Sequence, residues 1–203
     1  MSKVGIIDAD LMDNGTRHPN LALMKISGYY KELGEEVKLI YKSYDEVTEY
    51  DRLFMSKVFN FTEVPAWVLE LPNLEIGGTG FYDDHASNLP DEIEHHMPDY
   101  HLYDEWVEAQ IAAGHHKRNY VDYTDFSIGF TTRGCFRKCS FCVNKKYDHV
   151  FRHPYVKHTT KIFSMRLKFF QAQPVSDALR KTRRAFQQPF PYEQNGLPKQ
   201  TVL

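Results

Sequence analysis

Residues 3–10, Lys-Val-Gly-Ile-Ile-Asp-Ala-Asp, decide the fold of the N-terminal part of this chain. The run is short and β-branched, and it ends in acidic residues before an Asn-Gly turn signal, which is typical of a buried strand. Apolar residues then recur at near-helical spacing from Leu21 to Leu33, and Gly34 marks the end of the predicted helix. Residues 36–41, Glu-Val-Lys-Leu-Ile-Tyr, predict a second strand. Strand, helix and strand within about forty residues form a βαβ unit, which predicts a parallel sheet.

The same alternation of strands and helices continues to residue 82. Residues 51–60 predict a third strand, residues 64–71 a short helix, and residues 73–81 a fourth strand that runs into a Gly-rich turn. We therefore predict the α/β fold class, with a small doubly wound parallel sheet domain over residues 1–82. Open α/β sheets bind ligands at the C-terminal edge of the sheet. The polar residues expected at that edge are Asp8, Asp10, Asp13, Asn14 and Thr16.

The segment 128–146 carries all three cysteines of the chain, Cys135, Cys139 and Cys142, in a C-x3-C-x2-C spacing. Three soft thiolates within eight residues can converge on one metal centre. They suit a [4Fe–4S] cluster in which one iron keeps an open position, because cluster irons are usually held by four cysteines. Residues 125–132 predict a short buried strand that leads into this loop, and α/β folds place their chemistry on loops after strand ends.

This loop resembles that of the radical SAM superfamily, which carries C-x3-C-x-aromatic-C after the first strand of a partial (β/α) barrel. Phe141 fills the aromatic position, and Gly-Phe-Thr-Thr-Arg-Gly before the first cysteine is also similar. The resemblance implies that Cys135, Cys139 and Cys142 hold three irons of a [4Fe–4S] cluster, that S-adenosylmethionine chelates the fourth, and that Phe141 lies against its adenine. It further implies an electron donor as partner and reductive cleavage of S-adenosylmethionine, which would start radical chemistry on an unknown substrate.

Residues 1–82 resemble the cobalamin-binding-like domain that often precedes a radical SAM barrel. The Asp-x-His-x-x-Gly motif of that family, which supplies an axial imidazole, is absent. His18 follows Asp13 at the wrong spacing, and His85 lacks the following glycine. We therefore expect no cobalamin and favour a structural domain without a ligand.

A structural zinc site is the alternative interpretation of the three cysteines. His149 or His153 would complete a Cys3His set, and the chain would then be a non-enzymatic, zinc-stapled binding module. A disulfide is less favoured, because three cysteines leave one over and the N-terminus lacks a secretory signature.

The remaining segments divide at residues 82, 122 and 153. Residues 83–122 predict a polar linker with a helix over 103–113, and residues 123–153 the first strand and cluster loop of a radical SAM domain. Five more βα units of roughly 30 residues each would need about 150 residues. Only 61 residues follow Cys142, so we expect an incomplete barrel, and the sequence leaves open whether this single chain is an enzyme.

Residues 154–203 form an atypical basic tail. Residues 151–203 contain 10 Lys and Arg but only two acidic residues, Asp177 and Glu193. Three interpretations are open: a basic helix that binds nucleic acid, a docking segment for a partner, or a shifted reading frame. The loss of acids and of strand–helix alternation favours the third, which would make the chain an inactive fragment, and nucleic acid is not the expected partner.

Composition bounds the class of protein. The chain has 203 residues, of which 42% are hydrophobic, and a formal net charge of -2. No apolar run approaches the roughly 20 residues that span a bilayer. We expect a soluble, cytoplasmic protein without a membrane partner.

Overall fold

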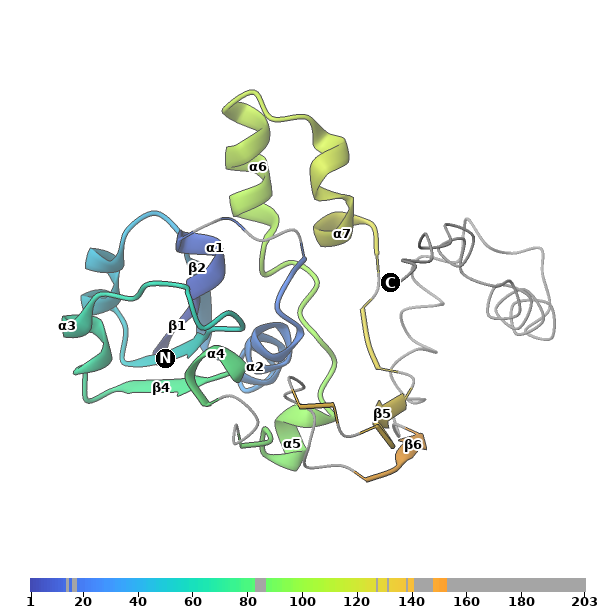
Figure 1. Ribbon diagram of the computed structural model, residues 1–203. Helices are drawn as coiled ribbons and strands as arrows, with labels where there is room; N and C mark the ends of the chain where they lie inside the picture. Colours follow the sequence, from blue (N-terminus) through green and yellow to red (C-terminus); the bar gives the residue numbers. More distant parts are fainter. Residues whose placement is uncertain are drawn as a thin grey trace, which may run out of the picture. The chain divides into compact units, whose positions relative to one another are not determined.

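The computed structural model describes residues 1–13, 15, 18–82, 87–126, 128–130, 132–137, 139–140 and 148–152 (Figure 1). All of them belong to one compact unit, Met1–Thr159. In chain order the elements are β1 (Lys3–Asp8), α1 (Ala9–Asp13), α2 (Leu21–Glu32), β2 (Glu36–Ile40), the 3₁₀ helix η1 (Tyr44–Glu49), β3 (Arg52–Ser56), α3 (Ala66–Leu69), β4 (Leu74–Gly77), α4 (Thr79–Tyr82), α5 (Asp91–Glu94), α6 (Asp104–Ala112), the 3₁₀ helix η3 (Lys117–Tyr120), α7 (Val121–Thr124), β5 (Thr132–Gly134) and β6 (Val150–Arg152).

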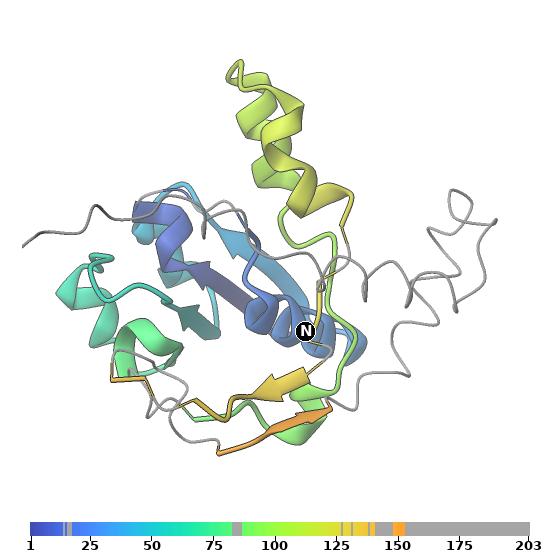
Figure 2. The same ribbon diagram turned by 45° about the vertical axis from the view of Figure 1, so that its right-hand side comes forward.

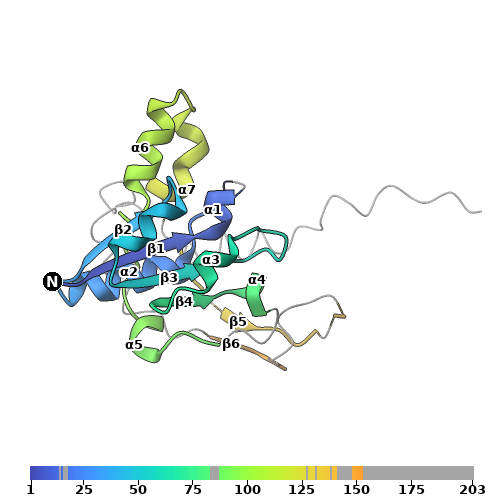
Figure 3. The ribbon, with the colours of Figure 1, turned by 90° about the vertical axis from the view of Figure 1, so that its left-hand side faces the viewer.

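The first four strands form one parallel sheet in the order β2-β1-β3-β4 (Figure 3). In the register, Ile6 of β1 lies opposite Leu39 of β2 on one side and Phe54 of β3 on the other. The chain adds β2 on one side of β1 and then crosses to the other side to add β3. The strand order therefore reverses between β1 and β3, and open α/β sheets bind ligands at the C-terminal ends of such strands. The parallel sheet and the α/β class predicted from the sequence are confirmed.

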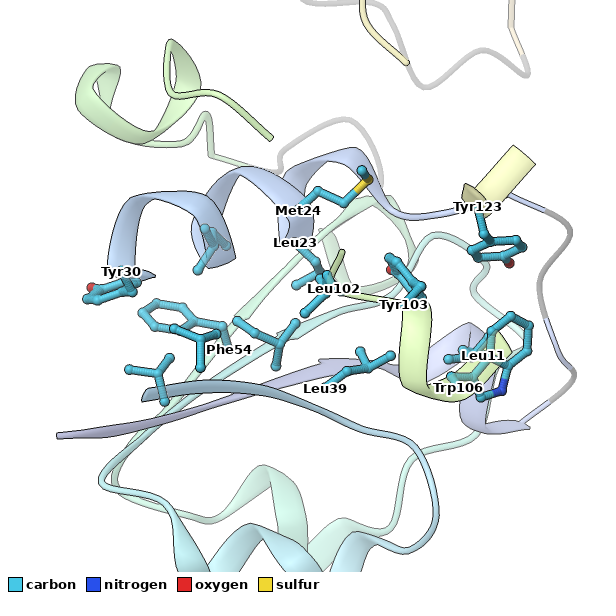
Figure 4. Packing of buried hydrophobic residues seen from close by; sticks show 14 of the residues in the cluster. Leu11, Leu23, Met24, Tyr30, Leu39, Phe54, Leu102, Tyr103, Trp106 and Tyr123 are labelled. Atoms are coloured by element: carbon cyan, nitrogen blue, oxygen red, sulfur yellow. The ribbon is translucent and has the colours of Figure 1, made fainter. Parts of the chain in front are cut away.

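Both faces of the sheet are covered, because successive side chains of a strand point to opposite faces. One face packs against α2, and Figure 4 shows Leu39 and Phe54 of the sheet beneath Leu23 and Tyr30 of the helix. The other face packs against η1 and α3. Its buried cluster contains Ile7, Ala9, Ile40, Val47, Leu53, Met55 and Val68. Burial on both faces explains why the two central strands, β1 and β3, carry near-continuous apolar runs, whereas the edge strands β2 and β4 also carry exposed charged residues.

The segment predicted as a polar linker contributes to the same core. Residues 88–124 carry α5, α6, η3 and α7, and their buried apolar side chains are Ile93, Leu102, Tyr103, Trp106, Val107, Tyr120 and Tyr123. The ring of Trp106 lies 5.3 Å from that of Tyr120 and 5.0 Å from that of Tyr123, measured between centroids. The helix predicted over 103–113 is confirmed as α6, and this segment packs on the α2 side of the sheet (Figure 4).

The strand predicted over residues 125–132 is wrong in position. Residues 128–130 have no regular structure, and Phe126 and Phe130 are 54% and 47% exposed. The strand instead is β5, which pairs antiparallel with β6 (Figure 2). An antiparallel partner can return through a loop, whereas a parallel partner needs a long crossover connection, and β6 returns directly from the cysteine loop.

The basic tail, residues 154–203, lies outside the described residues. A helix with both the length and the apolar character needed to cross a bilayer does not occur in the part of the chain that the structure describes.

Candidate functional site

A cavity of about 720 Å³ lies at the point where the strand order reverses. Its walls come from the ends of β1 and β3, the turn before α4, the start of α2, and segments that include α5 and β5. Sites for small molecules usually have volumes of about 300–1,000 Å³. The cavity lies at the edge of the sheet where the sequence predicts that ligands bind. Its volume is large enough for a small molecule, although the sequence favours a structural domain without a ligand.

Asp8, the last residue of β1, contributes a buried carboxyl group to this cavity. Its oxygens accept hydrogen bonds from the hydroxyl of Tyr103, at 2.8 Å, and from the backbone N–H of Leu11, at 3.3 Å. Burial raises the pKa of Asp8 to about 6, against the lowering effect of these two donors, and the charge of Asp10 raises it further. Burial and the neighbouring Asp8 raise the pKa of Tyr103 well above its usual range, so its hydroxyl stays protonated.

Asp10 holds the loop after β3 against the end of β1. Its carboxylate accepts hydrogen bonds from the backbone N–H of Val58, at 2.7 Å, from that of Phe59, at 3.4 Å, and from the hydroxyl of Thr62, at 2.5 Å. These bonds leave Asp10 2% exposed although it lines the cavity. The carboxylate therefore shapes the loop that forms one wall.

Asn20 performs three functions at the start of α2. Its side-chain oxygen caps the helix by accepting from the N–H groups of Ala22 and Leu23, at 3.1 and 3.4 Å. Its amide nitrogen donates to the hydroxyl of Ser56 at the end of β3, at 2.9 Å. Its backbone N–H donates to the hydroxyl of Tyr103 at 3.0 Å, so one residue ties the helix both to Ser56 in the cavity wall and to the start of α6.

Three charged side chains from distant segments meet at another wall of the cavity. Lys25 of α2 lies with Nζ 3.2 Å from Oε2 of Glu94 in α5, and Nη2 of Arg133 in β5 lies 2.5 Å from Oε1 of the same carboxylate. Burial lowers the pKa of Lys25, an effect that Glu94 opposes and Arg133 reinforces. The guanidinium of Arg133 also lies 4.4 Å from the ring centroid of Phe130, and its Nε is buried without a hydrogen-bond partner among the residues that the structure describes. We call Lys25, Glu94 and Arg133 the charged triad.

The cysteine loop begins directly after β5. Gly134 pairs with Val150 of β6, so the two ends of the loop are held together at its base. Gly134 has a φ of +83°, and a Cβ on it would lie 2.2 Å from the carbonyl oxygen of His149, which only glycine avoids. Cys135 and Cys139 are free and partly buried, and the backbone N–H of Arg137 donates to Sγ of Cys135 at 3.4 Å.

The other predicted members of the metal and cofactor site, Cys142 and Phe141, lie outside the described residues, as does His153. Of the zinc candidates the structure places His149, whose Nδ1 lies 2.5 Å from a carboxylate oxygen of Asp148. Among the residues that are placed, no three His, Cys, Asp or Glu side chains come close enough together to hold a metal ion. The metal ligand set predicted from the cysteine spacing therefore stays a prediction.

Of the polar residues predicted for the ligand edge, the structure describes Asp8, Asp10 and Asp13. Asp8 and Asp10 line the cavity, whereas Asp13 is exposed on α1 and accepts a hydrogen bond from the backbone N–H of Glu63, at 3.2 Å. Asn14 and Thr16 lie outside the described residues. Tyr103 and the charged triad were not predicted, because they come from segments far apart in the chain and share no motif. No protein-family model, curated protein or solved structure matches the chain.

Proposed function

We propose that this chain is an iron–sulfur protein of the radical SAM type. Cys135, Cys139 and Cys142 would ligate a [4Fe–4S] cluster, and Phe141 would lie against the adenine of S-adenosylmethionine. The observation that supports this proposal best is the position of Arg133, which lines the cavity two residues before Cys135. A ligand in the cavity would therefore lie close along the chain to the first residue of the predicted cluster.

The donor set suits iron–sulfur chemistry. Cys135 and Cys139 are free thiols in a partly buried setting, and thiolates are the usual ligands of iron–sulfur clusters. The pairing of β5 with β6 closes a loop that contains all three cysteines of the chain. Closure at the base limits how far the three sulfur atoms can separate, because a short loop has few conformations.

The cluster and S-adenosylmethionine, when bound, would supply the electron transfer and the radical chemistry. The residues of this chain would hold the reactants and exclude water. Phe59 and Phe130 give the cavity aromatic walls, and Asp10 fixes the loop that carries Phe59. We also propose that residues 123–153 form the start of the incomplete (β/α) barrel that the resemblance implies, with the antiparallel pair β5–β6 at the base of its cluster loop.

Anaerobic reconstitution tests this function. Iron and sulfide are quantified in the purified full chain, and the electron paramagnetic resonance spectrum of the reduced protein is recorded with and without S-adenosylmethionine. We expect a cluster whose spectrum changes when S-adenosylmethionine is added. Cys139→Ser should lose the cluster, whereas Ser140→Ala, at the neighbouring position, should keep it. A spectrum that does not respond to S-adenosylmethionine would contradict the open iron position.

The contact between His149 and Asp148 favours a second candidate, the zinc-stapled module. Histidine ligands of metals usually donate one ring N–H to a carboxylate, which leaves the other nitrogen for the metal, and Asp148 lies at Nδ1 of His149. Metal analysis separates the two candidates. One zinc per chain, lost in His149→Ala, would support the module, and iron that is retained in His149→Ala would support the cluster.

A further inference from the structure

We propose that the cavity binds a small organic anion, with its phosphate or carboxylate group held by Lys25 and Arg133 and its apolar body against the aromatic walls. This inference rests on the cavity and the charged triad alone. It therefore stands or falls separately from the iron–sulfur proposal.

The charge balance of the triad leaves an excess of one positive charge. Two cations share one carboxylate, and the side chains of Lys25 and Glu94 are only 8% and 15% exposed. A buried charge without a compensating partner is costly, and burial lowers the pKa of Lys25 accordingly. An anionic ligand would complete the pairing.

The hydrogen-bond balance points the same way. Each oxygen of the Glu94 carboxylate faces one cation of the triad. An ammonium offers three donors and a guanidinium five, in a fork that matches the oxygens of carboxylates and phosphates. Within the described part of the chain, the buried Nε of Arg133 has no acceptor. The contacts with Glu94 use Nζ of Lys25 and Nη2 of Arg133, so each cation has further N–H groups for a ligand in the cavity that both residues line.

The other end of the cavity does not suit an anion. The N-terminus of α2 would ordinarily be the anion site of such a fold. Here the side chain of Asn20 already accepts from the N–H groups of Ala22 and Leu23. Asp8 and Asp10 lie at the end of β1 and would repel negative charge. Among the remaining ionisable groups that line the cavity, His18 is paired with Asp122, at 2.6 Å.

Binding of simple probes to the full chain tests the inference. Isothermal titration calorimetry compares phenyl phosphate and benzoate with benzyl alcohol, which has a similar body but no charge, and inorganic phosphate shows whether the anion alone suffices. Charge-assisted hydrogen bonds in a buried site correspond to roughly tenfold or more in affinity. We expect phenyl phosphate or benzoate to bind at least about tenfold more tightly than benzyl alcohol.

Two substitutions in the charged triad should change the affinity for the anion in opposite directions. Lys25→Met removes the excess positive charge and should weaken binding of the anion about tenfold, whereas Glu94→Gln raises that charge and should tighten it by a similar factor. Lys42→Met removes the same charge from an exposed site, 64% accessible, and should change nothing. Benzyl alcohol should respond to none of the three.

Equal binding of charged and neutral probes would overturn the inference, as would weaker anion binding in Glu94→Gln or no binding of any probe. The triad would then be only a brace between α2, α5 and β5. Thermal melting of each variant shows whether it is folded. Anion binding by a chain that takes up no iron would leave this inference intact and refute the iron–sulfur function alone.

Discussion

The hydroxyl of Tyr103 donates a hydrogen bond to the carboxylate of Asp8 over 2.8 Å, although the two residues are 95 positions apart in the chain. The same hydroxyl accepts from the backbone N–H of Asn20, at 3.0 Å. These bonds join the end of β1, the start of α2 and the start of α6. The edge of the cavity therefore depends on a segment that follows the sheet in the sequence.

The buried carboxyl of Asp8 should make folding pH-dependent. Its pKa is about 6 in the folded protein and 3.8 when solvated, so the folded state alone takes up a proton as the pH falls from 6 to 4. Because proton uptake by the folded state alone favours folding, the contribution of Asp8 to the free energy of unfolding rises as the pH falls from 6 to 4, by about 3 kcal/mol in all. Urea unfolding at several pH values should show this rise in the native chain and a flatter profile in Asp8→Asn. Identical profiles would contradict it.

Tyr103→Phe tests the same pH dependence in a second way. Asp8→Asn removes the group that takes up the proton, whereas Tyr103→Phe removes only its hydrogen-bond donor. The donor hydroxyl lowers the pKa of Asp8, so its removal should raise that pKa further and move the window to higher pH. A single buried hydrogen bond contributes about 1 kcal/mol, and more where one partner is charged. Urea unfolding of Tyr103→Phe at the same pH values measures both the loss of stability and the shift of the pH window. An unchanged pH window would show that the Tyr103 hydroxyl does not affect the pKa of Asp8.

Gly134→Ala should loosen the base of the cysteine loop. The substitution forces a side chain into a positive φ and toward the carbonyl of His149, at a cost of about 1–3 kcal/mol. We expect lower retention of bound metal, measured as metal per chain after gel filtration, with little change in the unfolding of the sheet domain. Gly129→Ala, where a Cβ meets nothing within 4 Å, is the control. Equal retention in both variants would contradict the role of the hairpin.

Trp106→Ala should destabilise the whole unit. The side chain is 7% exposed and packs against Tyr120 and Tyr123, and truncation of such a residue costs about 3–5 kcal/mol. Ile111→Ala, on the same helix but 38% exposed, should cost less than about 1 kcal/mol. Urea unfolding compares the two, and a small effect of Trp106→Ala would mean that residues 88–124 are only loosely attached.

Asn20→Ala should weaken α2 and open the cavity wall. Loss of the cap costs about 1–2 kcal/mol, and the bond to Ser56 is lost with it. Asn20→Ser keeps a capping oxygen but is too short for Ser56, so about half of the effect or less should remain. Chemical unfolding followed by circular dichroism gives both values. Equal losses would show that the tie to Ser56, and not the cap, matters.

The sheet could be predicted because its signals are local. β1, α2 and β2 form a βαβ unit whose strand ends and helix stop are visible in the sequence. The ends of β3 and β4 were predicted too late. After Ser56 the backbone N–H of Val58 donates to the Asp10 side chain and no longer to a strand, and β4 ends at Gly77, directly before Gly78 with its φ of +101°.

The packing of residues 88–124 could not be predicted, because its apolar residues stand among acids and histidines without a clear period. Ile93, Leu102 and Trp106 are buried in a cluster that also contains residues of β1 and α2, far away in the chain. The residues of the candidate site also differ in how far the sequence predicts them. Asp8 and Asp10 follow from a strand end, whereas the charged triad exists only once three distant segments have come together.

The two tryptophans of the chain lie in different settings. Trp67 in α3 is 44% exposed, whereas Trp106 in α6 is enclosed by tyrosine rings. Emission from Trp106 should shift to the red when α6 leaves the sheet, while that of Trp67 changes little. Native fluorescence, simplified by Trp67→Phe, thus reports the undocking of this helix without any added label.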